Sequence, residues 1–179
     1  YVSVTLQPGA TGKDTSLEGA NPTTNYGSEV TGEVAQTAFG AGPFRTLFEF
    51  DTSAWTDRDW VYSAAFTLVK GGLGATDTDV FIRRITRQDW TEAAATWNTI
   101  NGSTAWTALG GDYTTLNQTT ATWLSTDLTR TFTLTDMMKD SVITGKLGIL
   151  IMCQSEASGS QAITFKTSEN ATAADRPML

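Results

Sequence analysis

The sequence contains no histidine and a single cysteine, Cys153, among its 179 residues. Serine and cysteine nucleophiles that rely on a histidine base are therefore excluded, as are zinc sites built from histidine or from several cysteines. A lone cysteine cannot form a disulfide within the chain, and Cys153 ends an apolar run, 147–153, where a small buried side chain is expected. Since no other nucleophile motif or cofactor fingerprint occurs in the sequence, we expect a protein that is not an enzyme.

Positive charge and long hydrophobic runs are also scarce. The chain has 12 Lys and Arg against 19 Asp and Glu, which gives a formal net charge of −7. Because polyanion binding relies on clustered basic side chains, nucleic acid is not an expected partner. No run approaches the roughly 18 apolar residues of a membrane span, so we expect no membrane insertion. The chain begins at Tyr1 rather than at Met, and we expect a processed or excised piece of a longer product.

What is present is typical of one β domain covering residues 1–179. The chain is threonine-rich and 40% hydrophobic, a composition that favours pleated, half-buried surfaces over helices. Alternation of apolar and polar side chains predicts strands at 2–6, 13–17, 30–36, 44–50, 62–70, 80–86, 131–134, 147–153 and 162–167. The run 147–153 is apolar on both faces and is therefore expected at the centre of a sheet.

Two further details complete the predicted architecture. In the strand 62–70, the apolar face is expected to consist of Tyr62, Ala64, Phe66 and Leu68. One short helix is expected after Thr135, whose side chain would cap it, and it would end at Gly145. Together these elements predict an all-β fold: a two-sheet antiparallel β-sandwich of jelly-roll type with one short helix.

Several short motifs occur at characteristic distances from one another along the chain. The opening segment 13–27 reads K-D-T-S-L-E-G-A-N-P-T-T-N-Y-G, and 89–98 reads D-W-T-E-A-A-A-T-W-N. Three shorter motifs accompany them: R-T-L-F-E-F-D-T-S (45–53), G-G-D-Y (110–113) and F-K-T-S-E (165–169). This set resembles the DNRLRE domain family over nearly the whole chain. The resemblance implies a jelly-roll sandwich, and some members of that family are carbohydrate-binding modules that bind alginate, a polyuronate. A polysaccharide or cell-surface glycan is therefore an expected partner.

Candidate ligand-binding residues lie in the glycine-rich segment 105–118, which we expect to be a loop. Its bulky side chains are hard to bury, so Trp106, Asp112 and Tyr113 are expected to form an exposed platform for sugar rings. Arg84 belongs to the one basic cluster of the sequence and is a further candidate, although alternation places it on the sheet face opposite Arg83.

The motif 89–98 is open to two interpretations. Its aromatic and polar side chains either line a ligand groove or pack beneath a long loop, with Glu92 and Asn98 satisfying loop backbone groups. The second interpretation is favoured, and it predicts that Trp97 is largely buried.

One interpretation places a structural calcium ion where the opening loop meets the closing strand. Asp14, Asn25 and Glu169 carry the hard oxygen ligands that Ca²⁺ takes in sandwich domains. The other interpretation, which is favoured, is that Asp14 caps the turn and Tyr26 anchors it, with no ion present.

Two functions from different classes remain open. The first is an extracellular, non-catalytic recognition module that binds a glycan or cell-surface polymer, or attaches a larger assembly to it. The second is a structural or decoration subunit on the surface of a virion or other extracellular assembly, whose partners would be neighbouring subunits or copies of itself.

Overall fold

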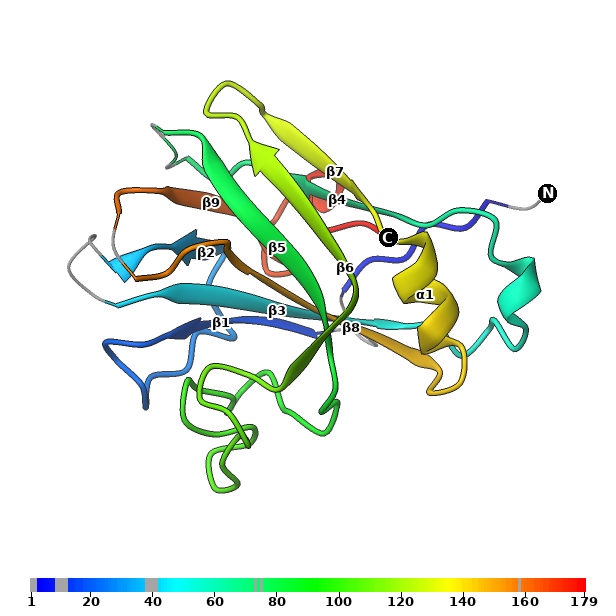
Figure 1. The fold of residues 1–179 in the computed structure, drawn as a ribbon, viewed down its shortest axis with the longest axis horizontal. Coiled ribbons are helices and arrows are strands. Elements are labelled where there is room, and N and C mark those ends of the chain that lie inside the picture. The colour runs from blue at the N-terminus through cyan, green and yellow to red at the C-terminus, as the bar shows by residue number, and fades with distance from the viewer. Residues whose placement is uncertain (1–2, 9–12, 38–41, 73, 75, 158) are drawn as a thin grey trace.

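The computed structural model describes residues 3–8, 13–37, 42–72, 74, 76–157 and 159–179, and within them the chain is mostly strand (Figure 1). The strands are β1 (Lys13–Glu18), β2 (Thr31–Ala35), β3 (Phe44–Asp51), β4 (Ala65–Val69), β5 (Thr78–Ile85), β6 (Tyr113–Trp123), β7 (Thr129–Thr133), β8 (Lys146–Cys153) and β9 (Ala162–Lys166). Helical elements of the described chain include α1 (Thr135–Ser141) and the short 3-10 turns η2 (Arg58–Trp60) and η3 (Ala173–Asp175).

The larger sheet is built around β8. This strand pairs antiparallel with β5 on one side and with β3 on the other; β6 extends the sheet beyond β5, and β1 pairs with the free edge of β3. Every residue of β8 except Lys146 is buried. The prediction that 147–153 lies in the middle of a sheet is confirmed, and the reason is that both faces of this sheet are covered.

A second set of strands covers the inner face. β2 joins the larger sheet through the pair Ala35–Phe44, while Lys70, next to β4, bridges Phe165 in β9. Across the core, the Phe165 ring lies 5.8 Å from that of Phe48 and stacks on Trp123 at 6.1 Å between centroids. The strands β2 and β9, together with the pair β4–β7, thus face β3, β8 and β5 across a shared apolar core. The expected antiparallel, sandwich-like β fold with one short helix is confirmed, and the jelly-roll connectivity stays a prediction.

Three local predictions are wrong. Over residues 3–6 of the predicted strand 2–6 the chain is not a strand, although Leu6 exchanges backbone hydrogen bonds with Leu179; residue 2 lies outside the described residues. The segment 113–118, expected to be a loop, begins the eleven-residue strand β6. At α1 the N-cap is Leu134, and the hydroxyl of Thr135 instead accepts a hydrogen bond from the backbone N–H of Ala64.

Tyr62 is also misplaced by the sequence prediction. It lies before β4 and is 70% exposed, so it does not belong to the apolar face that Phe66 and Leu68 form. Its neighbour Trp60 is 65% exposed. Among the helices of the described chain, none has the length and apolar character needed to cross a membrane.

Candidate functional site

The outer face of the larger sheet is covered by the long connection between β5 and β6, residues 86–112, which Figure 1 shows in green at one side of the sheet. A second apolar core forms beneath it, made of side chains from this connection and from the outward-facing positions of β1, β3, β5 and β8: Leu17, Leu47, Ile85, Trp90, Ala95, Ile100, Trp106, Leu150 and Met152. The connection is therefore packed on the sheet and can hold side chains in fixed positions at its rim.

Trp106 and Asp112 serve this packing. Trp106 is 4% exposed, and its indole N–H donates to the carbonyl of Thr96 at 2.9 Å. The buried carboxylate of Asp112 accepts hydrogen bonds from the backbone N–H groups of Thr107 (2.9 Å) and Ala108 (2.7 Å), which closes the turn. The expectation that these residues form an exposed platform is wrong, because the loop folds back on the sheet and gives both a structural task.

Tyr113 is partly exposed and belongs to a different group of side chains, here called the Arg–aromatic cluster: Arg45, Phe81, Arg83, Trp97 and Tyr113. The guanidinium carbon of Arg45 lies 4.8 Å from the Trp97 ring centroid and 5.8 Å from that of Tyr113. That of Arg83 lies 4.7 Å from the Tyr113 centroid and 4.2 Å from that of Phe81. The cluster thus alternates aromatic rings and guanidinium groups across β3, β5, β6 and the connection.

Arg45 is the fixed member of the cluster. It is 8% exposed, and its Nε and Nη2 atoms donate to the two carboxylate oxygens of Glu156 at 2.8 and 2.7 Å. Its Nη1 donates to the carbonyl of Gly110 at 2.9 Å. Gly110 has a φ of +80°, and a Cβ there would lie 2.8 Å from both Arg45 and Trp97, so only glycine allows this close approach.

Arg83 is the more accessible guanidinium. Its Nε donates to the side chain of Gln118 at 3.0 Å, and its Nη1 lies 3.4 Å from the sulfur of Met152. Among the described residues, no carboxylate forms an ion pair with Arg83. It therefore retains hydrogen-bonding capacity and an uncompensated charge.

Arg84, the candidate chosen from the sequence, is not part of this arrangement. A register shift in the β5–β6 pairing lies between Ile82 and Arg84, and it is Arg83 that stacks on Tyr113. The Nε atom of Arg84 is buried and finds no hydrogen-bond acceptor in the described structure.

Trp97 is partly exposed and packs against the second core. The buried tryptophan of the motif 89–98 is Trp90, at 1% exposure. The favoured interpretation of that motif holds for Trp90, which packs beneath the connection, whereas Trp97 faces Arg45 at the rim. Next to Tyr113, a shallow depression of about 380 Å³ opens against Arg87 and Ala108.

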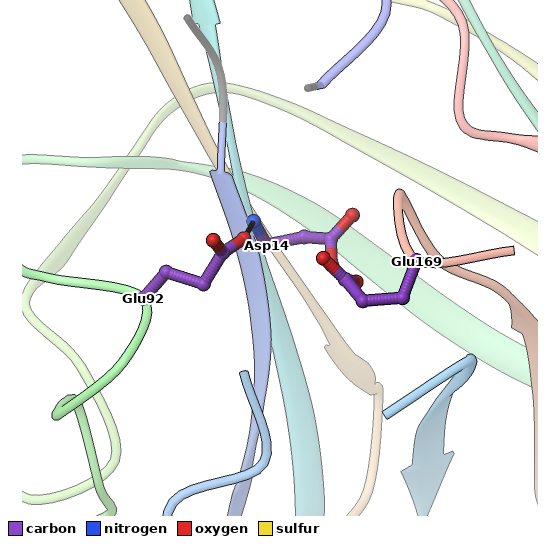
Figure 2. A group of neighbouring side chains, drawn as sticks. All are labelled: Asp14, Glu92 and Glu169. Carbon is purple, nitrogen blue, oxygen red and sulfur yellow. Dashed lines mark hydrogen bonds between the residues drawn. The ribbon is translucent and has the colours of Figure 1, made fainter. Parts of the chain in front are cut away.

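A second group, here called the acidic cluster, consists of Asp14, Glu92 and Glu169 (Figure 2). One carboxylate oxygen from each residue lies within 4.8 Å of the others. Asp14 belongs to β1, Glu92 to the connection and Glu169 to the segment after β9. Three stretches that are distant in the sequence therefore bring negative side chains to one place.

Local hydrogen bonds hold the acidic cluster in position. The backbone N–H of Asp14 donates to Glu92 Oε1, and that of Ser168 donates to Asp14 Oδ2, both at 2.8 Å. The hydroxyl of Ser168 lies 3.0 Å from both carboxylate oxygens of Glu169. Burial, and secondarily the charge of Glu169, raises the pKa of Asp14 well above its ordinary range, and burial also raises the pKa of Glu92.

The structure brings together Asp14 and Glu169, two of the three predicted metal ligands. The third member of the cluster is Glu92 and not the predicted Asn25. Asn25 uses its amide N–H groups to bind the backbone carbonyls of Glu92 and Ala95, each at 2.7 Å, while its oxygen accepts from Gly27. It positions the backbone of Glu92 and does not join the cluster. The only sequence signal for Glu92 was its place in the motif 89–98, because spacing does not reveal that this motif touches the opening loop.

Comparison with known protein families assigns the chain to one of them. The model of carbohydrate-binding module family 96 matches residues 6–179. The chain belongs to carbohydrate-binding module family 96. In the comparison with curated proteins, none matches. Membership of family 96 implies a carbohydrate ligand, and modules of such families are typically non-catalytic. It agrees with the carbohydrate-binding implication of the sequence resemblance, while the assignment to the DNRLRE domain family stays a prediction.

Proposed function

We propose that this family 96 module is a non-catalytic, extracellular recognition domain that binds a glycan chain across the Arg–aromatic cluster. The observation that carries the proposal is the stack of Trp97, Arg45, Tyr113 and Arg83 at the rim of an otherwise covered sheet face. Aromatic faces bind the C–H-rich faces of sugar rings, and guanidinium groups donate to hydroxyl or carboxylate oxygens. Both kinds of contact are available here on rigid supports.

The ordering of this surface favours binding without a large rearrangement. Arg45 is held on both sides by Glu156 and Gly110, so the rings that stack on it are positioned before a ligand arrives. Less conformational entropy is then lost when the ligand binds. Arg83, whose charge is not balanced by a described carboxylate, is the group that would meet an acidic or hydroxyl-rich part of the sugar.

The charge of the whole chain limits how strongly an acidic glycan is attracted. A net charge of −7 repels a polyanion at long range, while Arg83 attracts a carboxylate at short range. We therefore expect weak binding at a single site, with a millimolar dissociation constant corresponding to about −4 kcal/mol. Useful attachment then requires several linked copies, since multivalency raises avidity without new contacts.

The test is affinity electrophoresis of the monomer and of a multimerised form through neutral and uronic-acid polysaccharides. Tyr113→Ala and Arg83→Gln are each expected to weaken retention by at least about tenfold, the usual effect of losing a central contact. Trp60→Ala is the matched control, because Trp60 is an exposed aromatic outside the cluster. Melting temperatures of all variants show whether a loss of retention is only a loss of folding.

The outcomes discriminate between surfaces. If Trp60→Ala abolishes retention while Tyr113→Ala and Arg83→Gln bind as the unmodified chain does, the glycan site lies at Trp60 and Tyr62 and the present proposal is wrong. If no polysaccharide retains either form, the alternative expected from the sequence, a structural or decoration subunit of a virion or other extracellular assembly, becomes the better account. That alternative requires a stable protein interface of more than about 1,000 Å².

A further inference from the structure

We propose that Asp14, Glu92 and Glu169 bind a calcium ion that fastens β1, the connection 86–112 and the segment after β9 to one another. Two observations carry this inference. One oxygen from each carboxylate lies within 4.8 Å of the others. In addition, Asp14 is 1% exposed, and its Oδ1 atom is buried with no hydrogen-bond partner in the described structure. Figure 2 shows the carboxyl groups of Asp14 and Glu169 facing each other.

The negative charges of the acidic cluster favour a bound cation. In the described chain, none of the three carboxylates forms an ion pair with Lys or Arg, since the nearby Lys13 pairs with Glu49. A buried carboxylate without a partner is strongly unfavourable, and like charges at this separation make it worse. A bound cation removes both penalties and gives Asp14 Oδ1 the partner that it lacks.

The donor set and its dimensions favour calcium. All three ligands are carboxylate oxygens, which suits a hard cation and does not suit zinc or copper. Oxygens on opposite sides of Ca²⁺ lie about 4.6–5.2 Å apart, whereas the shorter bonds of Mg²⁺ bring them to about 4.0–4.2 Å. Separations of no more than 4.8 Å are compatible with the calcium sphere.

The surrounding structure supports the three ligands from different directions. Asn25 fixes the backbone of Glu92, and Ser168 holds both Asp14 and Glu169 through its N–H and its hydroxyl. An ion at this point would therefore link β1, the connection over the outer sheet face and the closing segment. Its expected effect is on stability, independent of whether the Arg–aromatic cluster binds a glycan.

The experiment compares thermal unfolding of the chelator-treated chain in calcium, in magnesium and in sodium chloride of matched ionic strength. An ion that binds only the folded state, at a hundredfold excess over its dissociation constant, is expected to raise the melting temperature by about 5–10 °C. Magnesium is expected to give a smaller rise at equal concentration. Titration calorimetry of calcium into the same protein gives the stoichiometry, expected to be one ion per chain.

Variants assign the effect to the acidic cluster. Asp14→Asn and Glu169→Gln are each expected to lose most of the calcium-dependent rise, and the second, at a less buried position, keeps the test valid if the first does not fold. Glu29→Gln removes one exposed carboxylate elsewhere and is expected to keep the full rise. Identical unfolding curves of the unmodified chain in chelator and in calcium would overturn the proposal, as would a rise that survives in both cluster variants.

Discussion

Arg45 in β3 and Glu156 in the turn after β8 form a two-point ion pair in which Nε and Nη2 donate to Oε1 and Oε2 at 2.8 and 2.7 Å. Their side chains are only 10% and 19% exposed. This geometry matters because the same guanidinium supports Trp97 and Tyr113. The pair thus connects the stability of the sheet rim with the surface proposed to bind a glycan.

Removing the acceptor of this pair should destabilise the chain. Glu156→Gln keeps the size of the side chain and removes its charge, so the mostly buried Arg45 loses charge-assisted hydrogen bonds worth about 1.5–3 kcal/mol. Urea unfolding followed by circular dichroism measures the change. The control is Asp89→Asn, which breaks the solvent-exposed pair with Arg87 and is expected to leave the midpoint nearly unchanged. Equal effects of the two substitutions would contradict the assigned role of Arg45.

The two tryptophans of the motif 89–98 should respond differently to truncation. Trp90 is 1% exposed within the second core, so Trp90→Ala is expected to reduce the free energy of unfolding by about 3–5 kcal/mol. Trp97 is partly exposed, and Trp97→Ala should cost less stability while weakening glycan retention. Chemical denaturation and affinity electrophoresis of both variants check the pair. A larger loss of stability in Trp97→Ala would mean that the rim, and not the second core, holds the connection.

The fold could be predicted from sequence wherever burial was complete. The run 147–153 has apolar side chains on both faces of the strand, because β8 has the main core on one side and the second core on the other. β6 is difficult to predict because, among the described strands, it pairs only with β5, and most of its residues are polar and at least partly exposed. Asn117 in it even has a φ of +57°. Threonine and asparagine in such an edge strand look the same as in a loop.

The candidate site was predictable only in part, for a different reason. Asp14 and Glu169 stand out as oxygen donors in two motifs, and the chain does bring them together. Glu92 could not be placed with them, because contacts between a loop and a strand 78 positions apart leave no periodic signal. The burial of Trp106 could not be predicted from the glycines around it. A glycine-rich segment is typical of an exposed loop, whereas this long connection buries its bulky side chains by folding onto the sheet.

Gly27 should be intolerant of any side chain. A Cβ at this position would lie 2.2 Å from the carbonyl oxygen of Glu92, which is backbone and cannot rotate away. Gly27→Ala is therefore expected to displace Glu92 and to cost about 1–3 kcal/mol of stability. Gly72→Ala is the matched control, since nothing lies within 4 Å of its added Cβ. The two melting temperatures are compared with calcium and with chelator; a neutral Gly27→Ala would show that the opening loop does not press against Glu92.

Cys153 should be chemically inert in the native chain and reactive only on unfolding. It is fully buried in β8, and burial, followed by the charges of Glu156, Asp79 and Glu33, raises the pKa of its thiol to about 12. Because the thiolate is the nucleophile, its fraction at pH 8 falls to about one in ten thousand, compared with roughly a quarter for an ordinary thiol. Iodoacetamide labelling followed by mass spectrometry is therefore expected to be slower by at least about a thousandfold in buffer than in denaturant.

Under native conditions the residual labelling should follow the population of the opened state, so calcium should slow it further if the acidic cluster binds the ion. Native labelling at the denatured rate would show that the centre of the sheet is accessible, which the packing of β8 between β3 and β5 does not allow.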